Sequence, residues 1–141
     1  MRLFKWTTRN ACFVPEIDNE HRTAFRLSEE LRQAIEGGAD AIVMQNVLRV
    51  LVSHLEEHFA HEEQLMRAIN CPIYNWHKGQ HDTARKRLRQ FTPQPDRADA
   101  ESARKLLEFL SVWLPDHTML TDRMMGAYVR NYARAHPAVP S

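Results

Sequence analysis

Chemically active side chains concentrate in one short stretch, HLEEHFAHEEQLM (54–66), where three histidines and four glutamates are interleaved with apolar residues. An α-helix advances about 100° per residue, so a helical reading assigns each side chain to a face. His58 and Glu62 then lie in the middle of the apolar stripe. The remaining glutamates are expected on the solvent-facing side: Glu56, Glu57 and Glu63.

A carboxylate on the buried face of a helix needs a positive partner, because an unpaired buried charge costs several kcal/mol. Arginine could supply that charge, and so could a metal ion. The apolar stripes of the predicted helices carry no central arginine or lysine. Glu62 beside a histidine therefore favours a metal site, since imidazole and carboxylate are both ligands for first-row transition metals.

Three further segments also direct imidazoles toward the interior. His77 and His81 are spaced i, i+4 and so share one helix face. His21 aligns with Phe25, and His117 aligns with the apolar residues of the last segment. Inward histidines from four separate segments exceed what a packed core needs, and together with the buried carboxylate they predict a metal centre.

Asp122 has two interpretations. It follows His117 by five residues and lies about 140° from the apolar stripe of a regular α-helix, which predicts a surface aspartate. A single wide π turn would instead bring it inward, and such turns recur at functional sites. Pro115 lacks a backbone N–H and weakens the hydrogen bonding just upstream. Helical periodicity alone leaves both interpretations open.

Helix breakers and capping residues divide the chain into four predicted helices, and the stretch before them is expected to pack Phe4, Trp6 and Phe13 onto the bundle. The expected ranges are an arm at 1–17 and helices at about 18–36, with Asp18 as N-cap, 40–69, 73–91 and 99–134. Because the connections are short, neighbouring helices should be antiparallel. We therefore expect one all-α domain over 1–141, an up-down-up-down four-helix bundle with an extended N-terminal arm.

The composition argues against several classes of protein. The chain has 141 residues and a formal net charge of +1, which gives no field that would favour nucleic acid or an anionic membrane. No apolar run approaches the ~18 residues of a membrane span. The first residues contain no apolar signal core, and Cys12 and Cys71 are expected to be reduced thiols. These features predict a cytoplasmic protein with no nucleic-acid or membrane partner.

Four motifs, in this order and spacing, resemble the hemerythrin family, and within it the single-domain bacteriohemerythrins. They are IDNEH (17–21), HFAHEEQLM (58–66), HKGQH (77–81) and WLPDHTMLTD (113–122). The resemblance covers nearly the whole chain and implies a non-haem di-iron centre with an oxo or hydroxo bridge. The implied ligands are His77, His81 and His117 for one iron, His21 and His58 for the other, and Glu62 and Asp122 as bridges.

That ligand count leaves one vacancy on the iron held by His21 and His58. Dioxygen would bind there, take one electron from each iron and the proton of the bridging hydroxide, and be held as a hydroperoxide, and reversal would release it. A histidine-rich set donates less negative charge than the glutamate-rich set of other di-iron bundles, which favours binding dioxygen over splitting it. We therefore expect reversible dioxygen binding for storage, delivery or sensing, and a sensing role would need an unidentified protein partner.

The resemblance also implies an apolar oxygen pocket that includes Trp113 and Leu114, and Phe25 is expected beside them. His54 occupies a position where the family often has tyrosine, and we expect it to lie near the centre without being a ligand. Two alternatives use the same site. One is a di-iron oxidoreductase of peroxidase or nitric oxide reductase type, and the other is an iron-handling protein.

Overall fold

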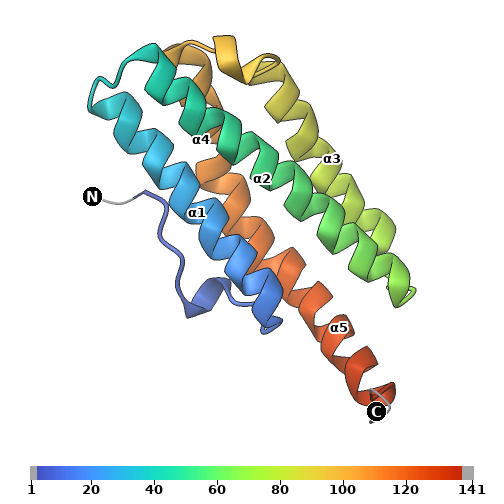
Figure 1. Cartoon of the computed structure of the whole chain (residues 1–141). Helices are drawn as coiled ribbons and strands as arrows, with labels where there is room; N and C mark the ends of the chain where they lie inside the picture. The colour runs from blue at the N-terminus through green and yellow to red at the C-terminus, as the bar shows by residue number, and fades with distance from the viewer. Residues whose placement is uncertain (1–2, 138–141) are drawn as a thin grey trace.

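The computed structural model describes residues 3–137, and four long helical segments form its body (Figure 1). The segments are α1 (Pro15–Glu36), α2 (Ala41–Ala68), α3 (Tyr74–Phe91) and a composite of α4 (Ala100–Asp116), η3 (His117–Asp122) and α5 (Arg123–Ala135). The described residues contain no strand. The expected all-α four-helix bundle is therefore confirmed.

Each helix packs against two neighbours. α1 contacts α2 and α4, and α3 contacts the same two helices, so α1 and α3 lie diagonally across the bundle. The chain changes direction at each connection in Figure 1. At the first of these turns Gly38 has a φ of 68°, a left-handed conformation that suits glycine. This arrangement lets all four segments direct side chains to one shared interior.

Two helix starts follow the sequence signals closely. The Asp40 carboxylate accepts a hydrogen bond from the Val43 N–H at 3.0 Å, and α2 begins at the next residue. The Asp99 carboxylate does the same with the Ser102 N–H at 2.8 Å, and α4 follows. Each cap satisfies a backbone donor that the first turn leaves unpaired.

The start of α1 differs from the predicted start at residue 18. The helix begins at Pro15, whose fixed φ suits the first helical position. Asp18 therefore lies inside the first turn, and the prediction that it caps the helix was wrong. Its buried carboxylate instead accepts the backbone N–H groups of Cys12 at 2.8 Å and Phe13 at 3.1 Å. Asp18 fastens the N-terminal arm to the bundle.

The arm precedes α1 and contains one short 3-10 turn, η1 (Thr8–Asn10), so it is not extended throughout. Residues 1–2 of the predicted arm lie outside the described residues. Phe4 is buried in the main core, and Arg22 stacks over the ring of Trp6 at 4.1 Å. Phe13 is 58% exposed, contrary to the expectation that it would pack on the bundle. The arm nevertheless covers one side of α1.

The fourth segment contains the wide turn that one interpretation of Asp122 required. The π-helical segment η3 begins at His117, directly after the helix turn that carries Pro115. The Thr118 hydroxyl donates to the carbonyl oxygens of Leu114 at 2.9 Å and Pro115 at 3.1 Å. These bonds satisfy carbonyls in the turn where the regular helical pattern changes. Asp122 consequently faces the interior and is fully buried.

Two apolar clusters fill the bundle. The larger contains α1 from Ala24 onward, α2 as far as Phe59, and residues of α3 and α4 up to Leu114. The smaller contains Cys12 and Met125 with residues from the start of α1 and the end of α2. The predicted ligands lie between these two clusters along each helical segment. Within the described residues, every helix is too short or too polar to traverse a lipid bilayer.

A tight contact between the arm and α5 generates the first prediction. A Cβ atom at Gly126 would overlap the carbonyl oxygen of Cys12, whereas a Cβ atom at Gly79 on α3 would meet nothing within 4 Å. Gly126→Ala should therefore destabilise the fold by about 1–3 kcal/mol because the arm must shift. The matched control Gly79→Ala should stabilise it by about 0.5–1 kcal/mol. Denaturant unfolding followed by circular dichroism measures both changes, and equal stabilities would contradict the predicted contact.

Candidate metal centre

Seven buried side chains from the four helical segments meet between the two apolar clusters. Every one of the seven predicted ligand positions is in this group, and each side chain is at most 4% exposed. The group consists of His21 from α1, His58 and Glu62 from α2, His77 and His81 from α3, and His117 and Asp122 from η3.

Glu62 divides its two oxygens between two sets of histidines. Oε2 lies 3.2 Å from the Nε2 atoms of both His21 and His58. Oε1 lies 2.9 Å from the Nε2 atom of His81 and 3.3 Å from that of His77. One carboxylate thus faces donors from three helices.

Asp122 on η3 also divides its two oxygens between two sets of histidines. Its Oδ2 lies 3.0 Å from the Nε2 atom of His21, while Oδ1 lies 3.0 Å from that of His77 and 3.1 Å from that of His117. The donor atoms therefore form a three-histidine group and a two-histidine group that share both carboxylates. Each of the two groups could hold a metal ion.

The spacing of these donors fits metal ions. The distances of 2.9–3.3 Å between donor atoms are close to the distance between neighbouring ligand atoms around an octahedral ion whose metal–ligand bonds are about 2.1 Å long. The Nε2 atoms of His81 and His117 also approach to 3.2 Å, and both oxygens of Asp122 are buried with no well-directed hydrogen bond. Buried polar atoms rarely lack partners, so cations between these donors would satisfy them.

Outer carboxylates orient two of the imidazoles. The Nδ1–H of His58 donates to Oε1 of Glu20 at 2.7 Å, and the Nδ1–H of His81 donates to Oε2 of Glu63 at 2.8 Å. A proton held on Nδ1 leaves the Nε2 lone pair directed at the centre, which is the tautomer that binds metal.

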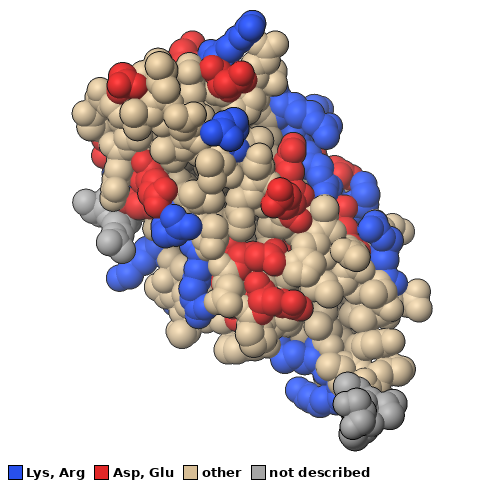
Figure 2. Space-filling model, viewed as in Figure 1, with Lys and Arg blue, Asp and Glu red and all other residues tan. Residues whose placement is uncertain are grey.

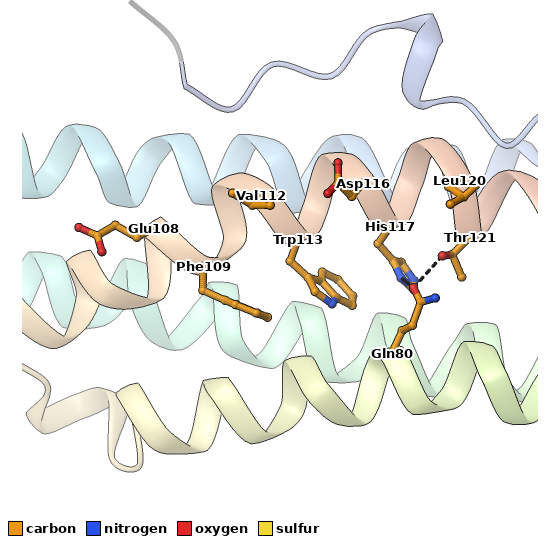
Figure 3. Close-up of a pocket in the computed structure, with 9 residues that line it drawn as sticks. All are labelled: Gln80, Glu108, Phe109, Val112, Trp113, Asp116, His117, Leu120 and Thr121. Atoms are coloured by element: carbon orange, nitrogen blue, oxygen red, sulfur yellow. Dashed lines mark hydrogen bonds between the residues drawn. The ribbon is translucent and has the colours of Figure 1, made fainter.

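A side-chain amide orients a third imidazole (Figure 3). Oε1 of Gln80 accepts the Nδ1–H of His117 at 2.9 Å and the hydroxyl hydrogen of Thr121 at 2.6 Å. The Nδ1 atoms of His21 and His77 are buried and have no such partner among the described residues. The imidazoles of the centre therefore differ in whether a surrounding residue fixes their orientation.

Glu63 is the clearest error of the helical-wheel prediction, which assigned it to solvent. It is 5% exposed, because its Oε2 pairs with Arg85 of α3 at 2.7 Å and also accepts the Nδ1–H of His81. A glutamate side chain is long enough to turn from the edge of a helix toward a neighbouring helix. The signal that could have identified it is Arg85, which follows His81 by four residues on the same face.

Aromatic rings cover the three-histidine side. Trp113 stacks on His117 with 4.2 Å between ring centroids, and Phe59 stacks on His81 at 4.5 Å. Trp113 and His117 also line a surface pocket of about 520 Å³, shown in Figure 3. Phe25 and Leu114 are buried in the larger apolar cluster that Trp113 packs against. Their role as the wall of an oxygen pocket stays a prediction.

The comparison with known proteins gives the centre a family context. Residues 12–129 match the hemerythrin HHE cation binding domain, a span that contains all seven buried ligand candidates. The chain belongs to the hemerythrin family. It therefore contains a metal-binding domain of that family, whose donors are available at the buried cluster.

Several hemerythrin relatives carry the name Bacteriohemerythrin. The one from Aquifex aeolicus is 31% identical over 75% of this chain and 82% of its own length. The one from Stenotrophomonas maltophilia is 27% identical over 96% of this chain and 90% of its own. The one from Clostridium acetobutylicum is 23% identical over 86% and 97%. The similarity thus extends over most of the length of these three relatives.

Without a bound metal, protons take the place of cations in this hemerythrin centre. Burial alone would lower the pKa of His21, but the facing carboxylates of Asp122 and Glu62 outweigh burial and raise that pKa to about 10. The pKa values of His58 and His77 rise to about 9 for the same reason. Burial would raise the pKa of Glu62, yet the surrounding imidazoles hold it well below its usual range. Metal binding must therefore displace protons.

These pKa shifts predict the pH dependence of metal-free stability. A histidine with a raised pKa stabilises the fold fully below its unfolded value of about 6.5, and that contribution is lost as the pH rises through about 9 to 10. The melting temperature of chelator-treated protein should fall between about pH 7 and pH 10. Metal-loaded protein should change less, because its protons are already displaced. Circular dichroism melts over this range measure the effect, and identical slopes for the two forms would refute it.

Proposed function

We propose that this hemerythrin-family chain binds dioxygen reversibly at a centre of two iron ions with an oxo or hydroxo bridge. The observation that carries the proposal is the division of both carboxylates between two histidine groups. Glu62 and Asp122 would bridge the ions. His77, His81 and His117 would hold one, and His21 and His58 the other.

The unequal groups would leave one iron with a position for an outside ligand. Three histidines and two shared carboxylates would supply five protein donors to one ion, while two histidines and the same carboxylates would supply four to the other. One solvent-derived bridge would add a donor to each ion. A six-coordinate preference is then met only on the three-histidine side. The open position is expected beside His21 and His58.

The donor types favour iron over zinc. Structural zinc is complete with four ligands in a tetrahedron, so seven donors with two bridging carboxylates exceed its needs. Imidazole and carboxylate together suit iron. When bound, the two irons would supply the two electrons that reversible dioxygen binding requires. Five neutral imidazoles to two carboxylates give limited negative donation, which favours binding over cleavage of dioxygen.

The surrounding residues would limit side reactions. Phe25 and Leu114 are 2% and 3% exposed and belong to the apolar cluster next to the centre. A dry apolar environment hinders the entry of water and of protons that would promote loss of the bound ligand.

The experiment that tests the proposed function is an oxygen titration. Protein reduced without oxygen should contain two irons per chain and, on admission of air, develop an oxo-to-ferric charge-transfer band that bleaches on degassing. Glu62→Gln should lose the band and the paired irons because one bridge is removed. Glu56→Gln, an exposed change on the same helix, should retain both. Rapid, irreversible consumption of dioxygen with a reductant would instead favour an oxidoreductase.

A further inference from the structure

Three imidazoles of the metal centre donate an outer N–H group to a side-chain oxygen, and one of the three acceptors is uncharged. Carboxylates accept the Nδ1–H groups of His58 at 2.7 Å and His81 at 2.8 Å. The amide oxygen of Gln80 accepts the Nδ1–H of His117 at 2.9 Å. His81 and His117 belong to the same three-histidine group. Within that group, one imidazole therefore faces a negative acceptor and another faces a neutral one.

The orientation of the Gln80 amide follows from the donors around it. Nε2 of His117 faces Oδ1 of Asp122 at 3.1 Å, on the side where a metal ion would bind, so the ring proton belongs on Nδ1. Only the oxygen end of an amide can accept that proton. The same oxygen lies 2.6 Å from the hydroxyl of Thr121, which can donate its hydrogen to it. An amide turned the other way would set its N–H groups against the N–H of His117.

Gln80 also connects two positions of the π-helical segment to a neighbouring helix. His117 and Thr121 both lie on η3, whereas Gln80 lies on α3. Figure 3 shows the Gln80 side chain reaching from α3 toward both residues. Thr121 is 2% exposed and directly precedes Asp122 in the chain. One amide thus holds the His117 ring and the residue beside a candidate bridging carboxylate.

The charge of an outer acceptor affects how strongly an imidazole donates to a metal ion. A carboxylate attracts the Nδ1 proton and makes the opposite nitrogen a stronger donor, whereas a neutral amide does so less. Stronger donation stabilises Fe³⁺ relative to Fe²⁺ and so lowers the reduction potential. The amide of Gln80 therefore limits donation by His117 and favours the reduced state, from which dioxygen uptake would start.

We propose that Gln80 is a positioning residue whose neutral amide sets the reduction potential of the iron held by His117 above the value that a carboxylate acceptor would give. Gln80 acts through the orientation and donor strength of that imidazole. The proposal rests on the proposed di-iron function for the identity of the metal. A carboxylate at this position would be accessible to water, because Gln80 is half-buried and lines the surface pocket of about 520 Å³.

The test compares two variants of full-length, iron-loaded protein, with the midpoint potential measured without dioxygen at one pH. Gln80→Glu keeps the acceptor oxygen and adds a charge. The equilibrium between Fe²⁺ and Fe³⁺ should then shift about tenfold toward Fe³⁺, which lowers the potential by about 59 mV for one electron. Gln80→Leu removes the acceptor, so the potential should rise instead. A role limited to packing would not give shifts of opposite sign.

Gln64→Glu is the matched control for the added charge. Gln64 is exposed on α2, and the face over α1 and α2 already carries both acidic and basic side chains (Figure 2). One further exposed carboxylate that bonds to no imidazole of the centre should leave the potential nearly unchanged. A second readout needs no iron. In metal-free protein, the slowly exchanging Nδ1–H proton of His117 should be detected by NMR in Gln80→Glu and lost in Gln80→Leu.

The outcomes separate the role of Gln80 from the proposed function. Shifts of the same sign in both variants, or a Gln80→Glu shift no larger than that of Gln64→Glu, would overturn the role of Gln80. Should Gln80→Glu fail to fold by circular dichroism, an unchanged or lower potential in Gln80→Leu would overturn it. Opposite shifts in a protein that shows no reversible dioxygen band would support the role of Gln80 and refute the proposed function. A reversible band with unchanged potentials would do the reverse.

Discussion

Two carboxylates without solvent exposure control the architecture of this protein. Glu62 and Asp122 are both fully buried, and every segment of the bundle directs at least one imidazole at them. Buried charges are tolerated only when opposite charges or cations lie within contact distance. The bundle therefore cannot be regarded as an apolar core with a site attached. Its middle layer is polar, and apolar clusters above and below exclude water from that layer.

Much of this layer could be predicted from residue spacing. The 3.6-residue period placed His58 and Glu62 on the buried stripe, and the i, i+4 spacing of His77 and His81 placed both on one face of α3. Asp122 required more, because a regular helix would have directed it elsewhere. Pro115 indicated a local departure from regular geometry, and the family resemblance selected the inward interpretation that η3 confirms.

The errors of prediction have a common physical cause. Helical wheels locate Cβ atoms, but a glutamate carboxylate lies three bonds further out and can turn toward an adjacent helix. Glu63 reaches His81 and Arg85 in this way, and Glu20 reaches His58 and His61. Which neighbour it meets depends on how the helices pack, and that information is not local in sequence. The predicted start of α1 was wrong for a similar reason, because the Asp18 carboxylate accepts hydrogen bonds from the arm and does not cap its own helix.

The two halves of the centre differ in how they are enclosed, and this difference bears on the proposed function. In the three-histidine half, Gln80 and the stacked ring of Trp113 orient His117, and Glu63 orients His81, whereas the Nδ1 atom of His77 has no partner among the described residues. The two-histidine half depends on Glu20, a partly exposed residue, while the Nδ1 atom of His21 has no partner among the described residues. A metal-binding imidazole with fewer hydrogen bonds to surrounding residues can move further. The half expected to exchange its outside ligand is thus the half that the chain restrains less.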